Sequence, residues 1–428
     1  MGNGVSGGYN YTPTTVSGIT NATSISVGGL SACATLSTGS VRCWGSGIDG
    51  QRANGIFNYF RRVRDNILTT GVTQFSMGSR SHSCATVNGG AQCWGGNSYG
   101  QLGDGTTTNR WSPVSVTGLS SGVTKVSVNG DNYAGYDSHS CALVNGGVKC
   151  WGRNSWGQLG DNSITDRYTP VDVSGLTSGV TDIETGPLHT CAIVAAGAVK
   201  CWGRNNSGQL GNNSTTDSRV PVDVVGVTGA TQLALTYGSS CAIVAGGAIK
   251  CWGYNDVGQL GDGTTSTSLV PVNVTGVTGA TSISGNGFDS AFFCAVISGA
   301  AKCWGNGGYQ RLGNGSGSNQ SSPTQVTGLT SGIVSVSTSA MSGCAINTAG
   351  GVKCWGNNPY GELGTGGGLS STPVDALGLQ SGVLASDGGY YANCFLVKGG
   401  GIKCAGAVIE SGLGWTPVPL TSTEVLFP

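Results

Sequence analysis

Hydrophobic and polar residues alternate in short runs along this chain. In residues 180–227, the segments "VTDIETG", "HTCAIV", "AVKCWG" and "VPVDVVGV" have the period of two typical of strands, and Gly/Asn-rich stretches separate them. No window has the helical period over a useful length, and no apolar run approaches the roughly 18 residues of a membrane span. The pattern predicts an all-β protein with no membrane span.

The four-run pattern repeats eight times. Sixteen cysteines fall in eight pairs, and the second members of successive pairs are 50 to 57 residues apart. Four short strands in a unit of about 51 residues are typical of a propeller blade. Eight such units nearly fill the 428 residues. We therefore expect residues 20–428 to form one β-propeller of about eight four-stranded blades, with seven blades plus an accessory unit as the alternative.

Several segments resemble the repeats of the regulator of chromosome condensation family. They are "GQLGDGT" at 100–106 and 258–264, "HSCA" at 82–85 and "CWGRN" at 150–154. The resemblance covers nearly the whole chain and implies a β-propeller, although known members usually have seven blades. With its many cysteines, the chain looks like an extracellular, disulfide-rich bacterial or phage type of this family.

One outer-strand segment is in excess. Segments led by proline recur near Pro113, Pro170, Pro221, Pro271, Pro323, Pro373 and Pro417, and the Arg-rich stretch 61–67 fills the place after unit one. "TPTTVSGI" at 12–19 is then a ninth segment for eight units. An unpaired strand edge invites association. We therefore expect residues 1–19 to close the ring or to pair with a neighbouring molecule.

The cysteine spacing predicts cross-strand disulfides. Pairs nine residues apart enclose two-residue turns such as Asn-Gly, and pairs ten residues apart enclose three-residue loops ending in Gly. Both arrangements place the two cysteines directly opposite each other at a non-hydrogen-bonded position. One bridge per blade follows, in the pairs Cys33–Cys43, Cys84–Cys93, Cys141–Cys150, Cys191–Cys201, Cys241–Cys251, Cys294–Cys303, Cys344–Cys354 and Cys394–Cys404.

The competing interpretation of the cysteines is zinc, but structural zinc sites usually take cysteines two to four residues apart. Eight disulfides indicate an oxidising destination, so we expect an extracellular protein that is secreted, held at a cell surface or carried on a virion. The start "MGNGVSGGYNYTP" does not resemble a signal peptide. A removed leader, another export route or release by lysis would each reconcile these observations.

Charge and motif content predict no enzyme. The chain has 20 basic and 20 acidic residues and no net charge, which gives no general attraction to nucleic acid. The three histidines, His82, His139 and His189, share one repeat position, so we expect each to pack or hydrogen-bond inside its own blade. "GQLGDGT" lacks the Lys-Ser/Thr ending of a phosphate loop and the pattern of a calcium loop. We therefore predict no catalytic residue, cofactor site or metal site.

The units depart from one another at aromatic insertions between the first and second strands. "GDNYAGYD" at 130–137, "GFDSAFF" at 287–293 and "GGYYANC" at 388–394 occupy equivalent positions, so we expect them on one face of the ring. Aromatic loops on a rigid scaffold are a common recognition surface. The candidate partner-binding residues are Tyr133, Tyr136, Phe288, Phe292, Tyr390, Tyr391 and, from an arginine cluster in unit one, Arg61 and Arg62.

These observations favour a binding, adhesion or assembly module whose partner is a protein, a glycan or further copies of the chain. A secreted protein inhibitor of a target enzyme is the alternative. A guanine-nucleotide exchange factor, the role of the family's namesake, fits less well, because that role belongs to a reducing compartment.

Overall fold

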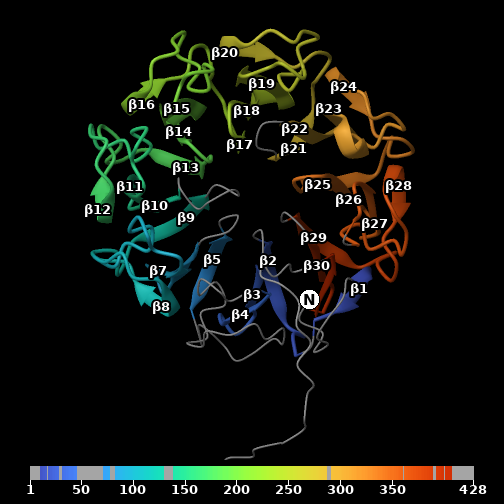
Figure 1. Cartoon of the computed structure of the whole chain (residues 1–428), viewed down its shortest axis with the longest axis horizontal. Helices are drawn as coiled ribbons and strands as arrows, with labels where there is room; N and C mark the ends of the chain where they lie inside the picture. Colours follow the sequence, from blue (N-terminus) through green and yellow to red (C-terminus); the bar gives the residue numbers. More distant parts are fainter. Residues whose placement is uncertain are drawn as a thin grey trace, which may run out of the picture.

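The computed structural model describes residues 10–16, 18–27, 31–45, 71–77, 82–129, 138–286, 291–359, 361–388, 392–399 and 401–406. They form an eight-bladed β-propeller in which every blade carries one disulfide (Figure 1). The eight blades confirm the first sequence expectation and exclude the arrangement of seven blades plus an accessory unit. The first strand of each blade lies nearest the ring axis (Figure 1).

Blades 1 to 4 follow one another along the chain. Blade 1 holds β2 (Ala22–Val27), β3 (Ser31–Leu36) and β4 (Val41–Gly45). Blade 2 holds β5 (Val72–Met77), β6 (His82–Val87), β7 (Gly90–Gly95) and β8 (Arg110–Ser115). Blade 3 holds β9 (Val123–Asn129), β10 (His139–Val144), β11 (Gly147–Gly152) and β12 (Arg167–Asp172). Blade 4 holds β13 (Val180–Thr185), β14 (His189–Val194), the short 3₁₀ turn η1 (Ala195–Gly197), β15 (Ala198–Gly203) and β16 (Ser218–Asp223).

Blades 5 to 8 complete the ring. Blade 5 holds β17 (Gln232–Leu235), β18 (Ser239–Val244), η2 (Ala245–Gly247), β19 (Ala248–Gly253) and β20 (Ser268–Asn273). Blade 6 holds β21 (Ala280–Asn286), β22 (Phe292–Ile297), β23 (Ala300–Gly305), η3 (Gly308–Gln310) and β24 (Gln320–Gln325). Blade 7 holds β25 (Ile333–Thr338), β26 (Ser342–Asn347), β27 (Val352–Gly356) and β28 (Ser370–Asp375). Blade 8 holds β29 (Val383–Gly388), β30 (Ala392–Val397), β31 (Gly401–Gly406) and β1 (Asn10–Thr15).

The turn chemistry explains why every hairpin keeps the same register. Asn145 and Gly146 have φ of 50° and 77°, the left-handed pair that a two-residue turn requires. Blade 4 uses a three-residue loop, in which Ala196 and Gly197 have positive φ. Cys141 lies opposite Cys150 in the first case, and in the second the two cysteines are again direct partners. The extra residue therefore lengthens the loop without shifting the strands.

The disulfides lie at these opposed positions. The Cα atoms of Cys141 and Cys150 are 4.1 Å apart, and those of Cys191 and Cys201 are also 4.1 Å apart. The short separation is the one expected for non-hydrogen-bonded partners in an antiparallel pair. All sixteen cysteines are paired, and their side chains are buried. The pairing predicted from the spacing is confirmed for all eight bridges.

The hydrophobic core is divided among the seams between blades. One cluster joins Cys141 and Val148 of blade 3 to Ile183 and Trp202 of blade 4, and each of the other seams has a cluster of its own. Trp44, Trp94, Trp151, Trp202, Trp252, Trp304 and Trp355 are all buried in these clusters. The tryptophan that follows the second cysteine in seven of the eight units therefore belongs to the core between blades.

The N-terminal segment closes the ring. β1 pairs antiparallel with β31, with Asn10 opposite Gly406 and Thr15 opposite Lys403. Beyond β1, Val16 and Ile19 are buried in the cluster between blades 8 and 1. β1 is thus the fourth strand of blade 8, not a spare ninth segment.

Two of the expected outer strands cannot be compared with the structure. In blade 8, β31 pairs with β30 on one side and β1 on the other, and the sequence expectation had placed an outer strand near Pro417. That segment itself, like the Arg-rich stretch 61–67 expected as the outer strand of blade 1, lies outside the described residues. Blade 1 accordingly shows three strands in the part of the chain that the structure describes.

Candidate functional site: the loop face of the ring

The strand register defines two faces of the ring. In blade 3, Asn129, His139, Gly152 and Arg167 lie side by side at one end of the four strands. This end also carries the connection between the first and second strands and the connection between the third and fourth strands. We call it the loop face. The opposite end, which carries the tight turns such as Asn145–Gly146, is the hairpin face. From the sequence, the aromatic insertions were predicted to share one face of the ring. The strands before and after insertion 130–137 are β9 and β10, and the strand ends that border it lie at the loop face.

A buried asparagine shapes the long connection between third and fourth strands in blades 2 to 5 and in blade 7, whereas blade 6 has Gly307 at this position. In blade 3, the Nδ2 of Asn154 donates to the main-chain oxygens of Ser163 and Thr165, at 3.2 and 3.1 Å. Its Oδ1 accepts the main-chain N–H of Leu159 at 3.0 Å. Asn97, Asn205, Asn255 and Asn358 make the corresponding contacts in other blades. A fully buried amide that holds both arms of the loop fixes the positions of the side chains exposed on it.

The aspartates of these loops are engaged within the loops. Asp161 accepts hydrogen bonds from Ser163 and from the Nε of Arg167, the latter at 2.7 Å. Partial burial raises the pKa of Asp161, but the hydrogen bonds and the Arg167 charge outweigh it and hold the pKa below its usual value. Partial burial likewise raises the pKa of Asp104, but hydrogen bonds from Thr106 and Arg110 and the Arg110 charge hold it below its usual value. Among the described residues, no group of three or more His, Cys, Asp and Glu side chains is placed to hold a metal ion.

Arginine side chains stack on aromatic rings along the loop face. The guanidinium of Arg153 in blade 3 lies 4.5 Å from the ring centroid of Tyr99 in blade 2. The guanidinium of Arg204 in blade 4 lies 4.6 Å from the ring of Trp156 in blade 3, and its Nη1 donates to the hydroxyl of Tyr237 at 2.7 Å. Stacking of this kind holds a guanidinium at a fixed place on the surface. The face therefore presents a row of stacked arginine and aromatic groups across blades 2 to 4, and the Arg204–Tyr237 hydrogen bond crosses a third seam, to blade 5.

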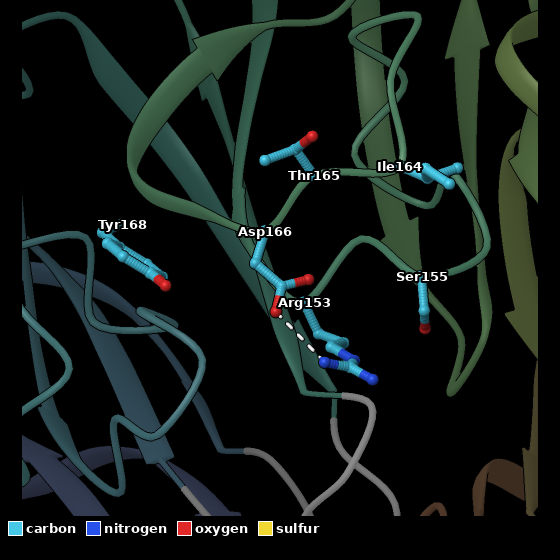
Figure 2. Close-up of a pocket in the computed structure, with 6 residues that line it drawn as sticks. All are labelled: Arg153, Ser155, Ile164, Thr165, Asp166 and Tyr168. Atoms are coloured by element: carbon cyan, nitrogen blue, oxygen red, sulfur yellow. Dashed lines mark hydrogen bonds and ion pairs between the residues drawn. The ribbon is translucent and has the colours of Figure 1, made fainter.

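An open cleft of about 450 Å³ lies within this row, in blade 3. Its lining residues are Arg153, Ser155, Ile164, Thr165, Asp166 and Tyr168. Figure 2 shows Tyr168 on one side, Ser155 and Ile164 on the other, and the Arg153–Asp166 ion pair between them. The Nη1 of Arg153 lies 3.1 Å from Asp166 Oδ2. Tyr168 and Ile164 are about half exposed, with 47 % and 52 % of their surface accessible.

A second charged group lies on the innermost strands of blades 3 and 4. Lys125 of β9 donates to Asp182 of β13 at 2.7 Å and lies 3.5 Å from Glu184. Burial lowers the pKa of Lys125, but the two carboxylates outweigh it and raise the pKa above its usual value. Burial raises the pKa of Glu184, and the nearby Lys125 opposes that rise. The positive charge of Lys125 is thus balanced by the carboxylates of Asp182 and Glu184, and these ion pairs link two neighbouring blades.

The three histidines form hydrogen bonds between blades, which corrects the expectation that each bonds inside its own blade. His82 Nε2 lies 2.7 Å from the hydroxyl of Ser140 in the next blade, and that hydroxyl donates to the main-chain oxygen of Gln101 at 2.8 Å. Because the serine proton is used in this way, Nε2 carries the proton of the neutral imidazole. His139 and His189 bond to Thr190 and Ser240 in the same manner.

Burial keeps these imidazoles neutral. Desolvation, with a smaller contribution from His139, lowers the pKa of both His82 and His189 to about 3. A neutral, buried imidazole that bridges two blades stabilises a seam, and the buried Ser140 hydroxyl beside His82 donates its proton to a main-chain oxygen.

Most residues predicted for partner binding lie outside the described residues. These are Tyr133, Tyr136, Phe288, Tyr390, Tyr391, Arg61 and Arg62. Phe292 is described and is fully buried in β22, with the guanidinium of Arg311 5.6 Å from its ring. It is therefore removed from the recognition set: it occupies the repeat position that holds histidine in blades 2 to 4, and that position faces the core.

Sequence reasoning missed the residues that the structure brings together on the loop face. Arg153 and Arg204 directly follow the "CWG" segment, and Tyr99 and Trp156 come three residues before the Leu of the loop. Aligning the repeats position by position could have identified these residues as candidates, because the residue type at both positions differs between units. Their contact across a seam, however, depends on how neighbouring blades pack.

Comparison with known proteins shows the family. The repeat of the regulator of chromosome condensation (RCC1) matches residues 88–133, 145–193, 196–243, 247–286 and 299–346, which is more than half of the chain. This chain belongs to the RCC1 repeat family. Within the family, it is 30 % identical over 253 residues to the E3 ubiquitin-protein ligase HERC2 of Mus musculus, covering 57 % of the chain but 5 % of HERC2. It is 31 % identical over 122 residues to the ultraviolet-B receptor UVR8 of Arabidopsis thaliana, covering 28 % of the chain and 27 % of UVR8.

Two solved structures share the fold. Human WBSCR16 matches with a TM-score of 0.63 and 20 % identity, over 86 % of this chain and 98 % of that structure. Prp20p of Saccharomyces cerevisiae, whose study concerns binding to Gsp1p and histones, matches with a TM-score of 0.63 and 18 % identity over 95 % of each chain. At these identities the match is evidence for the fold alone. The described part of the chain contains no helix long and apolar enough to cross a membrane.

Proposed function

We propose that this RCC1-repeat propeller is a non-enzymatic binding module that works outside the cell, on a cell surface or on a virion. It recognises a protein or glycan through its loop face. The observation that carries the proposal is the row of stacked arginine and aromatic side chains across blades 2 to 4. Arg, Tyr and Trp are the residue types that most often dominate binding energy at interfaces.

Rigidity of the loop face supports the same function. The Asn154 amide and its equivalents hold the long loops of blades 2 to 5 and 7, and Arg153 and Arg204 are fixed on aromatic rings of the preceding blade. A surface that is already ordered loses little conformational entropy when a partner binds. Arg153 is paired with Asp166 within the chain, and Arg204 donates to the hydroxyl of Tyr237, so recognition would depend on shape and on polar and aromatic contacts.

The disulfides support an extracellular setting. All sixteen cysteines are bridged inside buried hairpins, a pattern found in proteins that mature in oxidising compartments. The same observation argues against a guanine-nucleotide exchange role in a reducing compartment. A secreted enzyme inhibitor would use the same face and would appear in the experiment below as binding to a soluble enzyme.

The test compares the two faces of the ring with matched variants. The full chain is labelled and its saturable binding to cells or particles of its source is measured by co-sedimentation. Trp156→Ala removes the ring on which Arg204 stacks in the row, and Tyr254→Arg changes an exposed side chain in the loop-face connection of blade 5. Thr231→Arg and Thr281→Arg change exposed side chains at the hairpin-face ends of β17 and β21.

We expect the loop-face pair to weaken binding at least about tenfold, which corresponds to roughly 1.4 kcal/mol. The hairpin-face pair should bind like the unchanged chain. Loss of binding only in the hairpin-face pair would refute the assignment of the loop face, and equal binding by all four variants would refute it as well.

A further inference from the structure

We propose that the cleft in blade 3 binds a short, uncharged oligosaccharide. The inference rests on the proposed function and narrows it to one ligand class at one site. The cleft holds about 450 Å³, within the range of small-molecule sites, about 300–1,000 Å³. It opens onto the loop face, so a sugar chain seated in it can continue beyond it.

The charges of the cleft favour an uncharged ligand. Arg153 and Asp166 are the only charged residues among its lining residues, and they pair with each other at 3.1 Å. Asp166 also accepts the main-chain N–H of Asn154 at 2.8 Å through its other oxygen. The net charge of the lining is therefore zero, which offers no attraction to a strongly acidic or basic ligand.

The same pair is held in place before any ligand arrives. The guanidinium of Arg153 stacks on Tyr99 at 4.5 Å, and the Asp166 carboxylate is fixed by two donors. The fixed carboxylate can accept a hydrogen bond, and the fixed planar guanidinium beside it can donate one. Two adjacent hydroxyl groups of a sugar ring match this pair, because a hydroxyl can both donate and accept. Ser155 and Thr165 add hydroxyl-bearing side chains to the lining.

Tyr168 supplies the apolar surface that a sugar requires. One side of its ring packs against Gly100 of blade 2, where an added Cβ would lie 2.4 Å from the Tyr168 Cδ1 atom. Tyr168 as a whole is 47 % exposed and lines the cleft (Figure 2). A half-exposed aromatic ring beside polar groups can stack against the C–H face of a pyranose while the polar groups bind its hydroxyls.

The fold does not require this combination. At the repeat position of Tyr168 the other units carry Trp111, Arg219, Leu269 or Ser321, and at the position of Arg153 they carry Gly96, Arg204, Tyr254 or Asn306. Among these units, blade 3 alone joins an arginine–aspartate pair to an aromatic ring at these places. Blade 3 is also the unit whose repeat contains the insertion 130–137, in the sequence between β9 and β10.

The experiment titrates the full chain with maltotriose, cellotriose and chitotriose by isothermal titration calorimetry. We expect at least one of these uncharged trisaccharides to bind with a Kd of about 0.1–1 mM. Tyr168→Ala should weaken that binding at least about tenfold, whereas Tyr168→Phe, which keeps the ring, should stay within about threefold. The control is Leu384→Ala, which removes a large side chain that is 61 % exposed at the hairpin-face end of β29, outside the cleft, and should leave binding unchanged.

Absence of binding by all three sugars at about 10 mM would overturn the proposal, and so would equal binding by Tyr168→Ala and the unchanged chain. Binding to the source surface separates this result from the broader function. If Tyr254→Arg abolishes surface binding while Tyr168→Ala does not, the loop face is correct and the oligosaccharide site is wrong. If protease treatment of the surface removes binding and periodate treatment does not, the partner is a protein and the oligosaccharide proposal fails.

Discussion

The Nε1 of Trp151 donates a hydrogen bond of 2.9 Å to the main-chain oxygen of Gln101 in the preceding blade. The same oxygen accepts the hydroxyl of Ser140 at 2.8 Å. Trp202, Trp252, Trp304 and Trp355 repeat the contact at later seams. The long loop of one blade is thereby tied to the third strand of the next, so the loops that carry the loop face are part of the core.

Replacing this tryptophan should weaken the seam. Trp151→Phe removes the donor to Gln101 and part of a fully buried ring, so we expect the free energy of unfolding to fall by about 2–4 kcal/mol. Urea unfolding followed by circular dichroism measures the change. Trp156→Phe, on the partly exposed loop of the same blade, is the control and should cost less than about 1 kcal/mol. Equal losses in the two variants would contradict the role assigned to the buried bond.

Acid should destabilise the protein through its buried histidines. The pKa of His189 is about 3 in the folded chain and near 6.5 when unfolded, so only the unfolded chain gains this proton as the pH falls. The stabilisation is therefore complete above about pH 6.5 and is lost progressively toward pH 3. Urea unfolding between pH 7.5 and 4.5 should show stability falling with pH.

His189→Gln should reduce this pH dependence, because the variant lacks the group that the unfolded chain protonates. The control is Ser239→Ala in blade 5, which occupies the same repeat position without a titrating group. It should keep the full slope between pH 7.5 and 4.5. A His189→Gln variant with the slope of the unchanged chain would show that this imidazole is protonated when folded.

The two hairpin types should benefit equally from their disulfides. Cys141→Ala/Cys150→Ala opens a bridge across a two-residue turn, and Cys191→Ala/Cys201→Ala opens one across a three-residue loop. Each bridge closes a loop of about ten residues, and the entropy of that loop predicts a loss of at most about 2–3 kcal/mol. Denaturant unfolding should give similar losses, because both cysteine pairs are directly opposed. A difference of several kcal/mol would mean that one turn strains its bridge.

Ring closure should depend on the N-terminal strand. Deleting residues 1–19 removes β1 and the buried side chains Val16 and Ile19, and leaves the outer edge of β31 unpaired. We expect a lower unfolding free energy, association of the truncated chains through the open edge, or both. Light scattering and urea unfolding measure these outcomes. A truncated chain that stays monomeric with unchanged stability would show that β1 does not close the ring.

Much of the fold follows from the sequence because its signals are local and repeated. The period of two, the turn residues of Asn145–Gly146 and the cysteine spacing fixed the strands, the register and the disulfides. The match between "TPTTVSGI" and the other outer segments identified a strand, but its partner could not be derived. Pairing between β1 and β31 joins the two ends of the domain, and no local pattern records such a contact.

The candidate site was less accessible to sequence analysis, for a physical reason. A strand places alternate side chains on opposite sides of the sheet, but the sequence does not say what the neighbouring blade presents to each side. Phe292 therefore looked like a recognition residue although it is buried. Arg153, Asp166 and Tyr168 form one cleft only after the Asn154 amide has folded the loop between them.

Hydrogen exchange, measured by mass spectrometry on the full chain free and bound to its source surface, tests the central claim most directly. If the loop face binds the partner, peptides from 96–109, 153–166 and 204–217 should exchange more slowly in the bound state. Peptides covering the hairpin turns at 88–89 and 145–146 should exchange at unchanged rates. Protection of the hairpin turns with no change in the three loops would contradict the account.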